Sequence, residues 1–155
     1  MENLNRLNEY IDRNIDHFID DLKLLCEQPS ISAQNKGINE CVSILEKLME
    51  NVGIEVKIFE VKDGNPIVFG ELKNKNAKEC LGFYNHYDVQ PPEPLEKWVS
   101  PPFKPEIRDG KIYARGVSDN KGNIVARLEA VKTFIDVYGE VPVNLKFFVE
   151  GEEEI

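Results

Sequence analysis

The sequence has no apolar run near the roughly 20 residues that span a bilayer, and its first residues carry neither a basic region nor an apolar signal core. Basic charge is also scarce, since 19 Lys and Arg stand against 28 Asp and Glu and give a formal net charge of -9. A surface of this sign repels phosphate backbones. We therefore expect a cytoplasmic protein that binds neither membranes nor nucleic acid.

Cysteine is too sparse for a disulfide scaffold or a zinc finger. The three cysteines, Cys26, Cys41 and Cys80, form an odd set without C-x-x-C spacing, and each lies in an apolar stretch. We expect three buried free thiols in a reducing compartment. The chain also lacks a Gly-rich phosphate loop and a Ser or Cys beside a base, so nucleotide binding and nucleophilic catalysis have no support.

The remaining composition is typical of one globular domain, with 155 residues of which 41% are hydrophobic and 30% charged. Apolar residues spaced by three and four predict amphipathic helices over residues 4–25 and 42–49. A third helix is predicted from a cap at Ser118 or Asp119 to Tyr138. His17 lies among acids in the first helix, where we expect it to be exposed and without a ligand role.

Alternating or continuous apolar residues predict strands at residues 54–61, 67–72, 80–84 and 143–149. Asp109-Gly110 predicts a two-residue hairpin between two further short strands. The order strand, helix, strand favours a crossover onto a parallel neighbour. We therefore predict an α/β fold with a mostly parallel sheet, helices on both faces and a small antiparallel ribbon.

The carboxyl ends of parallel strands are where functional side chains gather. His86 and Asp88 follow the strand at residues 80–84 and point the same way if the chain stays extended. A metal-bound imidazole needs an acceptor on its other ring nitrogen, which a nearby carboxylate supplies. The pair alone also fits a buried histidine that binds an aspartate and no metal.

Acidic residues also follow two further predicted strands. Asp119 begins the third helix, where an aspartate also serves as an ordinary N-cap, and four glutamates fall within residues 150–154 after the last strand. These glutamates are either a solvated tail or a cluster whose mutual repulsion a divalent cation relieves. One histidine with several carboxylates suits Zn, Mn or Co better than Ca or Mg. The sequence therefore favours hydrolysis by metal-activated water.

From Leu81 onward the sequence resembles the metal-dependent aminoacylase and carboxypeptidase family, which includes carboxypeptidase G, succinyl-diaminopimelate desuccinylase, acetylornithine deacetylase and carnosinase-type dipeptidases. The resemblance lies in residues 86–92, 98–103, 107–116, 118–122 and 150–155, in the family's order. The helical amino-terminal part matches loosely. Residues 90–92 and 118–122 look most like the dipeptidase branch, although the deacylase branch shares the same catalytic skeleton.

The resemblance implies a role for each site residue. It makes His86 a ligand of one metal, Glu154 a ligand of the other, and Asp119 the carboxylate that bridges both. Two divalent ions are implied, zinc foremost, with manganese or cobalt as alternatives.

Catalytic roles follow from the same resemblance. Asp88 is implied to orient His86, and Glu153 to act as the general base, with Glu152 a second candidate because the run of glutamates leaves the register open. The family commonly has a cis peptide after the bridging aspartate, so we predict one at Asp119-Asn120.

The implied reaction is hydrolysis of a peptide or amide bond in a dipeptide or N-acyl amino acid by a water that two metals activate. Family members complete both metal sites with a downstream carboxylate and a late histidine, beyond a lid or dimerisation domain through which the complete protein is expected to form a homodimer. Neither group is present here, and His17 matches no family position.

We therefore expect residues 1–155 to be the truncated amino-terminal portion of a metallopeptidase catalytic domain, with weak metal binding and little or no turnover alone. The alternatives are an inactive fragment or non-catalytic binding module that keeps a partial metal site, and a scaffold protein whose acidic strand ends merely face solvent.

Overall fold

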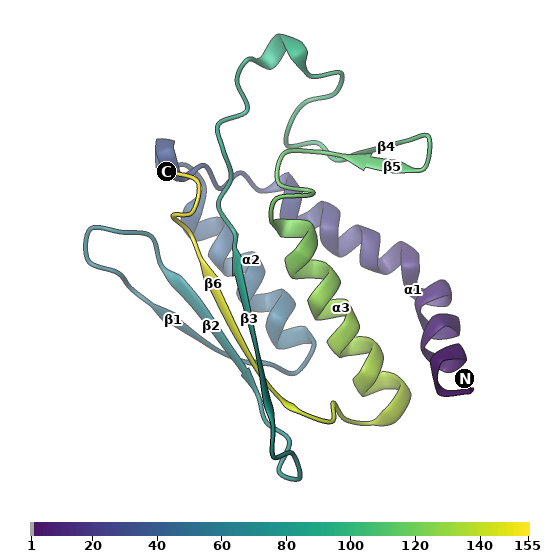
Figure 1. Ribbon diagram of the computed structural model, residues 1–155. Helices are drawn as coiled ribbons and strands as arrows, with labels where there is room; N and C mark the ends of the chain where they lie inside the picture. Colours follow the sequence, from purple (N-terminus) through teal and green to yellow (C-terminus); the bar gives the residue numbers. More distant parts are fainter. Residues whose placement is uncertain (1) are drawn as a thin grey trace.

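Three α-helices lie on one side of a four-stranded sheet in the computed structural model, which describes residues 2–155 (Figure 1). The helices are α1 (Glu2–Glu27), α2 (Ile38–Asn51) and α3 (Lys121–Tyr138), and short 3-10 turns occupy Ser32–Gln34 and Leu95–Lys97. All three predicted helices are therefore confirmed. The predicted cap of α3 is wrong, since Asn120 is the N-cap. The carboxylate of Asp119 contacts a histidine instead of the helix.

The sheet has the order β1-β2-β6-β3. Its strands are β1 (Glu55–Phe59), β2 (Ile67–Leu72), β3 (Cys80–His86) and β6 (Asn144–Glu150). β1 pairs with β2 and β2 with β6 in antiparallel fashion, whereas β3 and β6 are parallel. The α/β class is confirmed, but the sheet is mixed and not mostly parallel. A short connection joins β1 to β2 as a hairpin, and only the β3–α3–β6 segment has the helical crossover that parallel pairing needs.

A separate antiparallel ribbon consists of β4 (Glu106–Arg108) and β5 (Lys111–Tyr113), as predicted. Its turn residues, Asp109 and Gly110, have φ values of 50° and 72°. Two successive positive φ values are what a type I′ hairpin requires, because its twist matches that of the flanking strands.

The helices cover one face of the sheet within the described part of the chain, so the predicted cover on both faces is wrong. Leu145, Phe147 and Val149 of β6 are buried beneath the helices, whereas Phe148 between them is 46% exposed. Successive residues of a strand point to opposite faces, which explains the alternation. α2 and α3 pack on the sheet, and α1 packs mainly on α3 (Figure 1).

The cysteine prediction holds in part. Cys26 and Cys41 are buried and free, but Cys80 is exposed. Cys80 begins β3 at the edge of the sheet and shares the uncovered face with Phe148, which corrects the prediction. His17 is exposed, with its side chain at 57% and its Nε2 3.8 Å from Asp21, as predicted. Among residues 2–155, no helix has both the length and the apolar character that crossing a bilayer would take.

Lys121 fixes the start of α3 against the end of α1. Its side chain is fully buried, and its Nζ donates to the carbonyl oxygens of Leu25 at 3.0 Å and Gln28 at 2.6 Å. These carbonyls belong to the last turn of α1 and the residue beyond it, where backbone acceptors lack helical partners. Burial lowers the pKa of Lys121. This anchor places the amino end of α3 beside the carboxyl ends of β3 and β6 (Figure 1).

Candidate metal centre

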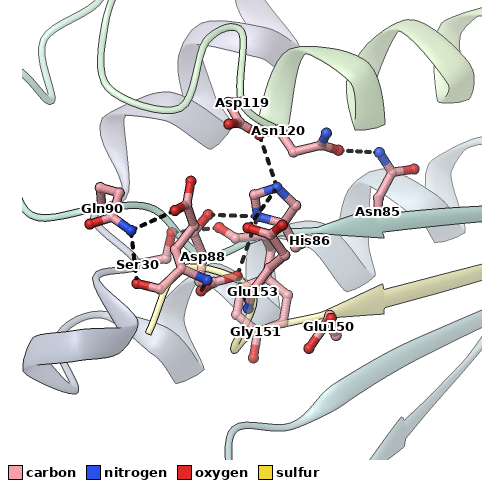
Figure 2. A network of polar contacts seen from close by, with 12 residues as sticks. Ser30, Asn85, His86, Asp88, Gln90, Asp119, Asn120, Glu150, Gly151 and Glu153 are labelled. Atoms are coloured by element: carbon pink, nitrogen blue, oxygen red, sulfur yellow. Dashed lines mark hydrogen bonds and ion pairs between the residues drawn. The ribbon is translucent and has the colours of Figure 1, made fainter.

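Three segments distant in sequence bring their polar side chains together beyond the carboxyl ends of β3 and β6 (Figure 2). The Nε2 of His86 is 3.0 Å from the Oδ1 of Asp119 and 3.9 Å from the Oε2 of Glu153. One ligand atom from each of His86, Glu153 and Glu154 lies within 4.8 Å of the others. The parallel pairing of His86 with Glu150 explains this convergence, because it ends both strands at the same level.

The ring of His86 is hydrogen-bonded through Nδ1, and its Nε2 faces Asp119 and Glu153. Its Nδ1 donates to the backbone carbonyl oxygen of Asp88 at 3.1 Å, and the Oδ1 of Asp88 is 3.4 Å from the same nitrogen. Asp88, the predicted orienting residue, thus contacts this side of the ring with both oxygens, and its carbonyl oxygen makes the shorter contact. Since Nδ1 carries a proton, Nε2 is the nitrogen that faces Asp119 and is available to a metal.

Two opposing effects act on the pKa of His86. Burial lowers it, but the hydrogen bond to Asp119, the carbonyl oxygen of Asp88 and the nearby charges of Asp88 and Glu153 outweigh burial and raise it above the usual value. The acids around Nε2 therefore favour a proton at the place that a cation would take. Metal binding at this nitrogen must displace that proton.

Asp88 has a second function that the sequence did not reveal. Its side chain is fully buried, and its carboxylate accepts hydrogen bonds from the backbone N–H groups of Glu153 at 3.3 Å and Glu154 at 2.9 Å. These bonds connect the segment after β3 to the turn after β6. The same residue therefore contacts the His86 ring and fixes the backbone that carries the two acids.

Tyr87 lies beneath this turn. It is fully buried, its backbone N–H donates to the carbonyl oxygen of Glu150 at 2.8 Å, and its hydroxyl donates to that of Pro66 at 2.8 Å. A Cβ placed on Gly151 would come within 2.2 Å of the Tyr87 hydroxyl oxygen. Only glycine fits over the ring, so the Glu-Gly step after β6 is required by this contact.

The remaining glutamates differ in their surroundings. Glu154 is held by Gln90, whose Nε2 donates to the Glu154 Oε2 at 2.7 Å. Glu152 accepts from the backbone N–H of Asn65 at 3.2 Å, in the loop between β1 and β2. Glu150 accepts a hydrogen bond from the hydroxyl of Tyr84. The structure thus brings Glu153 and Glu154 to His86 and holds Glu152 by a different loop.

The donors present fit a transition metal. One imidazole, of His86, and the carboxylates of Asp119 and Glu154 form the mixed nitrogen and oxygen set that zinc, manganese and cobalt accept. Zinc binds such atoms at about 2.0 to 2.2 Å, which puts neighbouring donors roughly 3 to 4 Å apart. The distance of 3.0 Å from His86 Nε2 to Asp119 Oδ1 falls in this range. The Asp119–Asn120 peptide is cis, as predicted.

Residues 82–155 match the family model described as Peptidase family M20/M25/M40. The resemblance to the M20 peptidases is confirmed. The match includes every residue with a predicted metal or catalytic role, from His86 to Glu154.

Curated relatives agree with the M20 match. The chain is 34% identical to the Beta-Ala-His dipeptidase of Rattus norvegicus over 166 residues, which cover 97% of this chain and 34% of that protein. It is 31% identical to the Homo sapiens protein of the same name, covering 97% of this chain and 33% of that protein. The chain thus spans about a third of the length of these relatives.

Solved structures show the same similarity. An M20 family metallo-carboxypeptidase from Sulfolobus solfataricus is 43% identical with a TM-score of 0.82, over 88% of this chain and 31% of that one. Human carnosine dipeptidase 1 is 29% identical with a TM-score of 0.89, over 97% of this chain and 35% of that one. The α/β arrangement around the candidate metal centre is therefore that of M20 structures.

Proposed function

We propose that the protein is a metal-dependent hydrolase that cleaves a peptide or amide bond in a small, dipeptide-like substrate. The observation that carries the proposal is the meeting of His86, Asp119, Glu153 and Glu154 at the ends of two parallel strands, with the first two 3.0 Å apart. Similarity to the Beta-Ala-His dipeptidases favours a dipeptide over an N-acyl amino acid.

We assign His86 to one divalent ion, Glu154 to a second, and Asp119 to a position between them. Zinc suits this donor set, with manganese and cobalt as alternatives. When bound, such ions supply a water of lowered pKa and a polarised carbonyl group. Two of these donors are held in place without an ion: His86 because its ring is buried, and Glu154 because Gln90 donates a hydrogen bond to it.

Glu153 is the proposed general base. Its side chain is 48% exposed, so its carboxylate is open to solvent and substrate, and it lies 3.9 Å from the metal-facing nitrogen of His86. In this role it takes a proton from the attacking water and delivers it to the departing amine. The hydrogen bond from Asn65 to Glu152 makes that neighbouring carboxylate the weaker candidate.

Zinc titration by calorimetry tests the site in this chain. Wild-type protein is expected to bind zinc, and His86→Ala and Asp119→Ala are expected to lose that binding. Absent binding, or equal binding by all three proteins, contradicts the proposal and favours a scaffold whose acids face solvent.

Turnover is tested with a panel of dipeptides and N-acyl amino acids in the presence of zinc. Glu153→Gln is expected to keep zinc affinity and to abolish any hydrolysis that the wild type shows. Near-normal turnover in Glu153→Gln contradicts the assignment of the base.

A second candidate is a non-catalytic binding module with a partial metal site. It is favoured by the scarcity of histidine, because His86 is the one imidazole at the cluster and His17 is exposed on α1. Zinc binding without hydrolysis of any substrate in the panel supports this candidate. Homodimer formation and a cytoplasmic location stay predictions.

A further inference from the structure

The position of Asp119 is not explained by packing. Its side chain is 70% exposed, yet its Oδ1 lies 3.0 Å from the buried ring of His86. The next residue, Asn120, is the N-cap of α3, but its side chain makes no capping hydrogen bond. Asparagine at this position usually accepts from the first turn of the helix. The Asn120 side chain is therefore engaged elsewhere.

Asn120 is bonded to the strand that carries His86. Its Oδ1 accepts a hydrogen bond from the Nδ2 of Asn85, which is 2% exposed and directly precedes His86 in β3 (Figure 2). This hydrogen bond thus links Asn85, which precedes His86, to Asn120, which follows Asp119. This link runs beside the contact between His86 and Asp119 and spans the same two segments.

Arg127 determines which way the Asn85 amide points. Its Nη1 donates to the Oδ1 of Asn85 and, at 2.8 Å, to the backbone carbonyl oxygen of Tyr84. A guanidinium group can only donate hydrogen bonds, so the oxygen of the Asn85 amide must face Arg127 and its nitrogen must face Asn120. Arg127 also lies over the ring of Phe83, 5.2 Å from the centroid, which restricts its own movement.

We propose that Arg127, Asn85 and Asn120 form a positioning relay that sets the separation of Asp119 and His86 and thereby the metal affinity of the site. The inference rests on the proposed metal-binding function. None of the three side chains belongs to the ligand set, so they act through the backbone that carries the ligands. The relay holds Asp119 ready for a cation despite its exposure to solvent.

Zinc calorimetry on the full chain tests the relay. Arg127→Met keeps an apolar stem over Phe83 but removes the donor, and we expect zinc to bind about tenfold or more weakly, as for other partners that orient metal ligands. Arg108→Met is the matched control, since it removes the same charge from the β4–β5 ribbon, where Arg108 bonds Ser100 and Glu106. Equal zinc affinity in Arg127→Met and Arg108→Met overturns the relay.

A double-mutant cycle separates positioning from general loosening of the fold. Arg127→Met combined with Asn120→Ala is expected to weaken zinc binding no more than either change alone, because both interrupt the same chain of bonds. Arg127→Lys, which can still donate to Asn85, is expected to restore part of the affinity. Fully additive losses, or no recovery with lysine, contradict the relay.

Hydrogen exchange of the Asn85 side-chain amide, measured by NMR without metal, keeps the relay and the proposed function distinguishable. The Asn85 amide protons are expected to exchange slowly in wild type and faster in Arg127→Met. Equal exchange in both proteins overturns the relay. A further outcome is faster exchange in Arg127→Met together with a wild-type protein that binds no zinc. That outcome overturns both the proposed function and the effect of the relay on metal affinity. Zinc binding that Arg127→Met leaves unchanged overturns the relay alone.

Discussion

The carboxylate of Asp88, just beyond β3, accepts a hydrogen bond from the backbone N–H of Glu154, just beyond β6, at 2.9 Å. The neighbouring N–H of Glu153 donates to the same carboxylate at 3.3 Å. A fully buried carboxylate requires such donors, because an uncompensated charge in the interior is costly. The two glutamates of the candidate metal centre are therefore positioned through their backbone by a residue that comes 65 and 66 positions earlier.

Asp88→Asn is expected to disturb the metal centre with little change in volume. One carboxylate oxygen of Asp88 becomes an amide nitrogen, which can only donate. The N–H group that this oxygen accepted from, that of Glu153 or Glu154, therefore loses its acceptor, and the contact of Oδ1 with the His86 ring is lost if Oδ1 is the atom replaced. We expect zinc affinity to fall about 10- to 100-fold and the free energy of unfolding to fall by about 1 to 3 kcal/mol. Calorimetry and urea unfolding measure the two effects. Asp109→Asn at the ribbon turn is the control, and an Asp88→Asn protein that matches it in both assays refutes this role.

Gly151→Ala is expected to displace the acidic turn from its support. The new Cβ would lie 2.2 Å from the hydroxyl oxygen of Tyr87, whose ring is buried and bonded to Pro66. Because the ring cannot leave without losing that bond, the turn must move, at a cost of about 1 to 3 kcal/mol in stability. Zinc affinity is expected to fall as well. Gly82→Ala on β3 has open space around the new Cβ, so it should leave zinc affinity unchanged.

Local sequence patterns predicted the elements of the fold but not all of its pairings. Residues 143–149 are mostly apolar, and this run predicted β6 within one residue at each end. The direction of pairing depends on how the connections run, which is why the hairpin of β1 and β2 made the sheet mixed. Cys80 lies in an apolar stretch, yet its exposure depends on β3 being the edge strand. Edge position is a property of the whole sheet.

The candidate site, like the fold, was predicted only in part from the sequence. Polar residues at strand ends pointed to His86, Asp119 and the run of glutamates, and the family resemblance singled out Glu153 and Glu154 within that run. The residues that hold them were missed, since their partners lie far away in the chain: Gln90 contacts Glu154, and Arg127 contacts Asn85. A spacing rule cannot detect such pairs. For Gly151, a glycine directly after an apolar strand was a usable signal of close packing.

Lys121→Met is expected to destabilise the junction of α1 and α3. The substitution keeps an unbranched apolar stem but removes the donor from the buried bond to the Leu25 carbonyl oxygen and from the part-buried bond to that of Gln28. Unsatisfied buried acceptors of this kind cost about 1 to 3 kcal/mol each. Urea unfolding of Lys121→Met beside Lys47→Met, an exposed residue on α2, measures the difference. Equal midpoints for the two variants rule out the anchoring role of Lys121.

Glu129 is expected to make the stability of the α1–α3 packing depend on pH. Its side chain is buried in α3, where burial, followed by the hydrogen bond and the charge of Asp21 on α1, raises the pKa of Glu129 to about 8. Lys132 opposes this shift and Asp136 adds to it. The protonated acid can share its proton with Asp21, whereas the ionised form places two carboxylates against each other.

Stability is therefore expected to fall as the pH rises through the interval between the pKa of an unfolded glutamate, about 4.3, and the folded value of about 8. Within that interval the native state binds the extra proton, so the free energy of unfolding decreases with pH, by at most about 1.4 kcal/mol per pH unit. Glu129→Gln keeps a donor for Asp21 but cannot ionise, and its urea-unfolding free energy should be flatter over the same interval. Glu50→Gln on α2, an exposed position, should retain the wild-type slope. A wild-type slope in Glu129→Gln would show that another group controls the pH dependence.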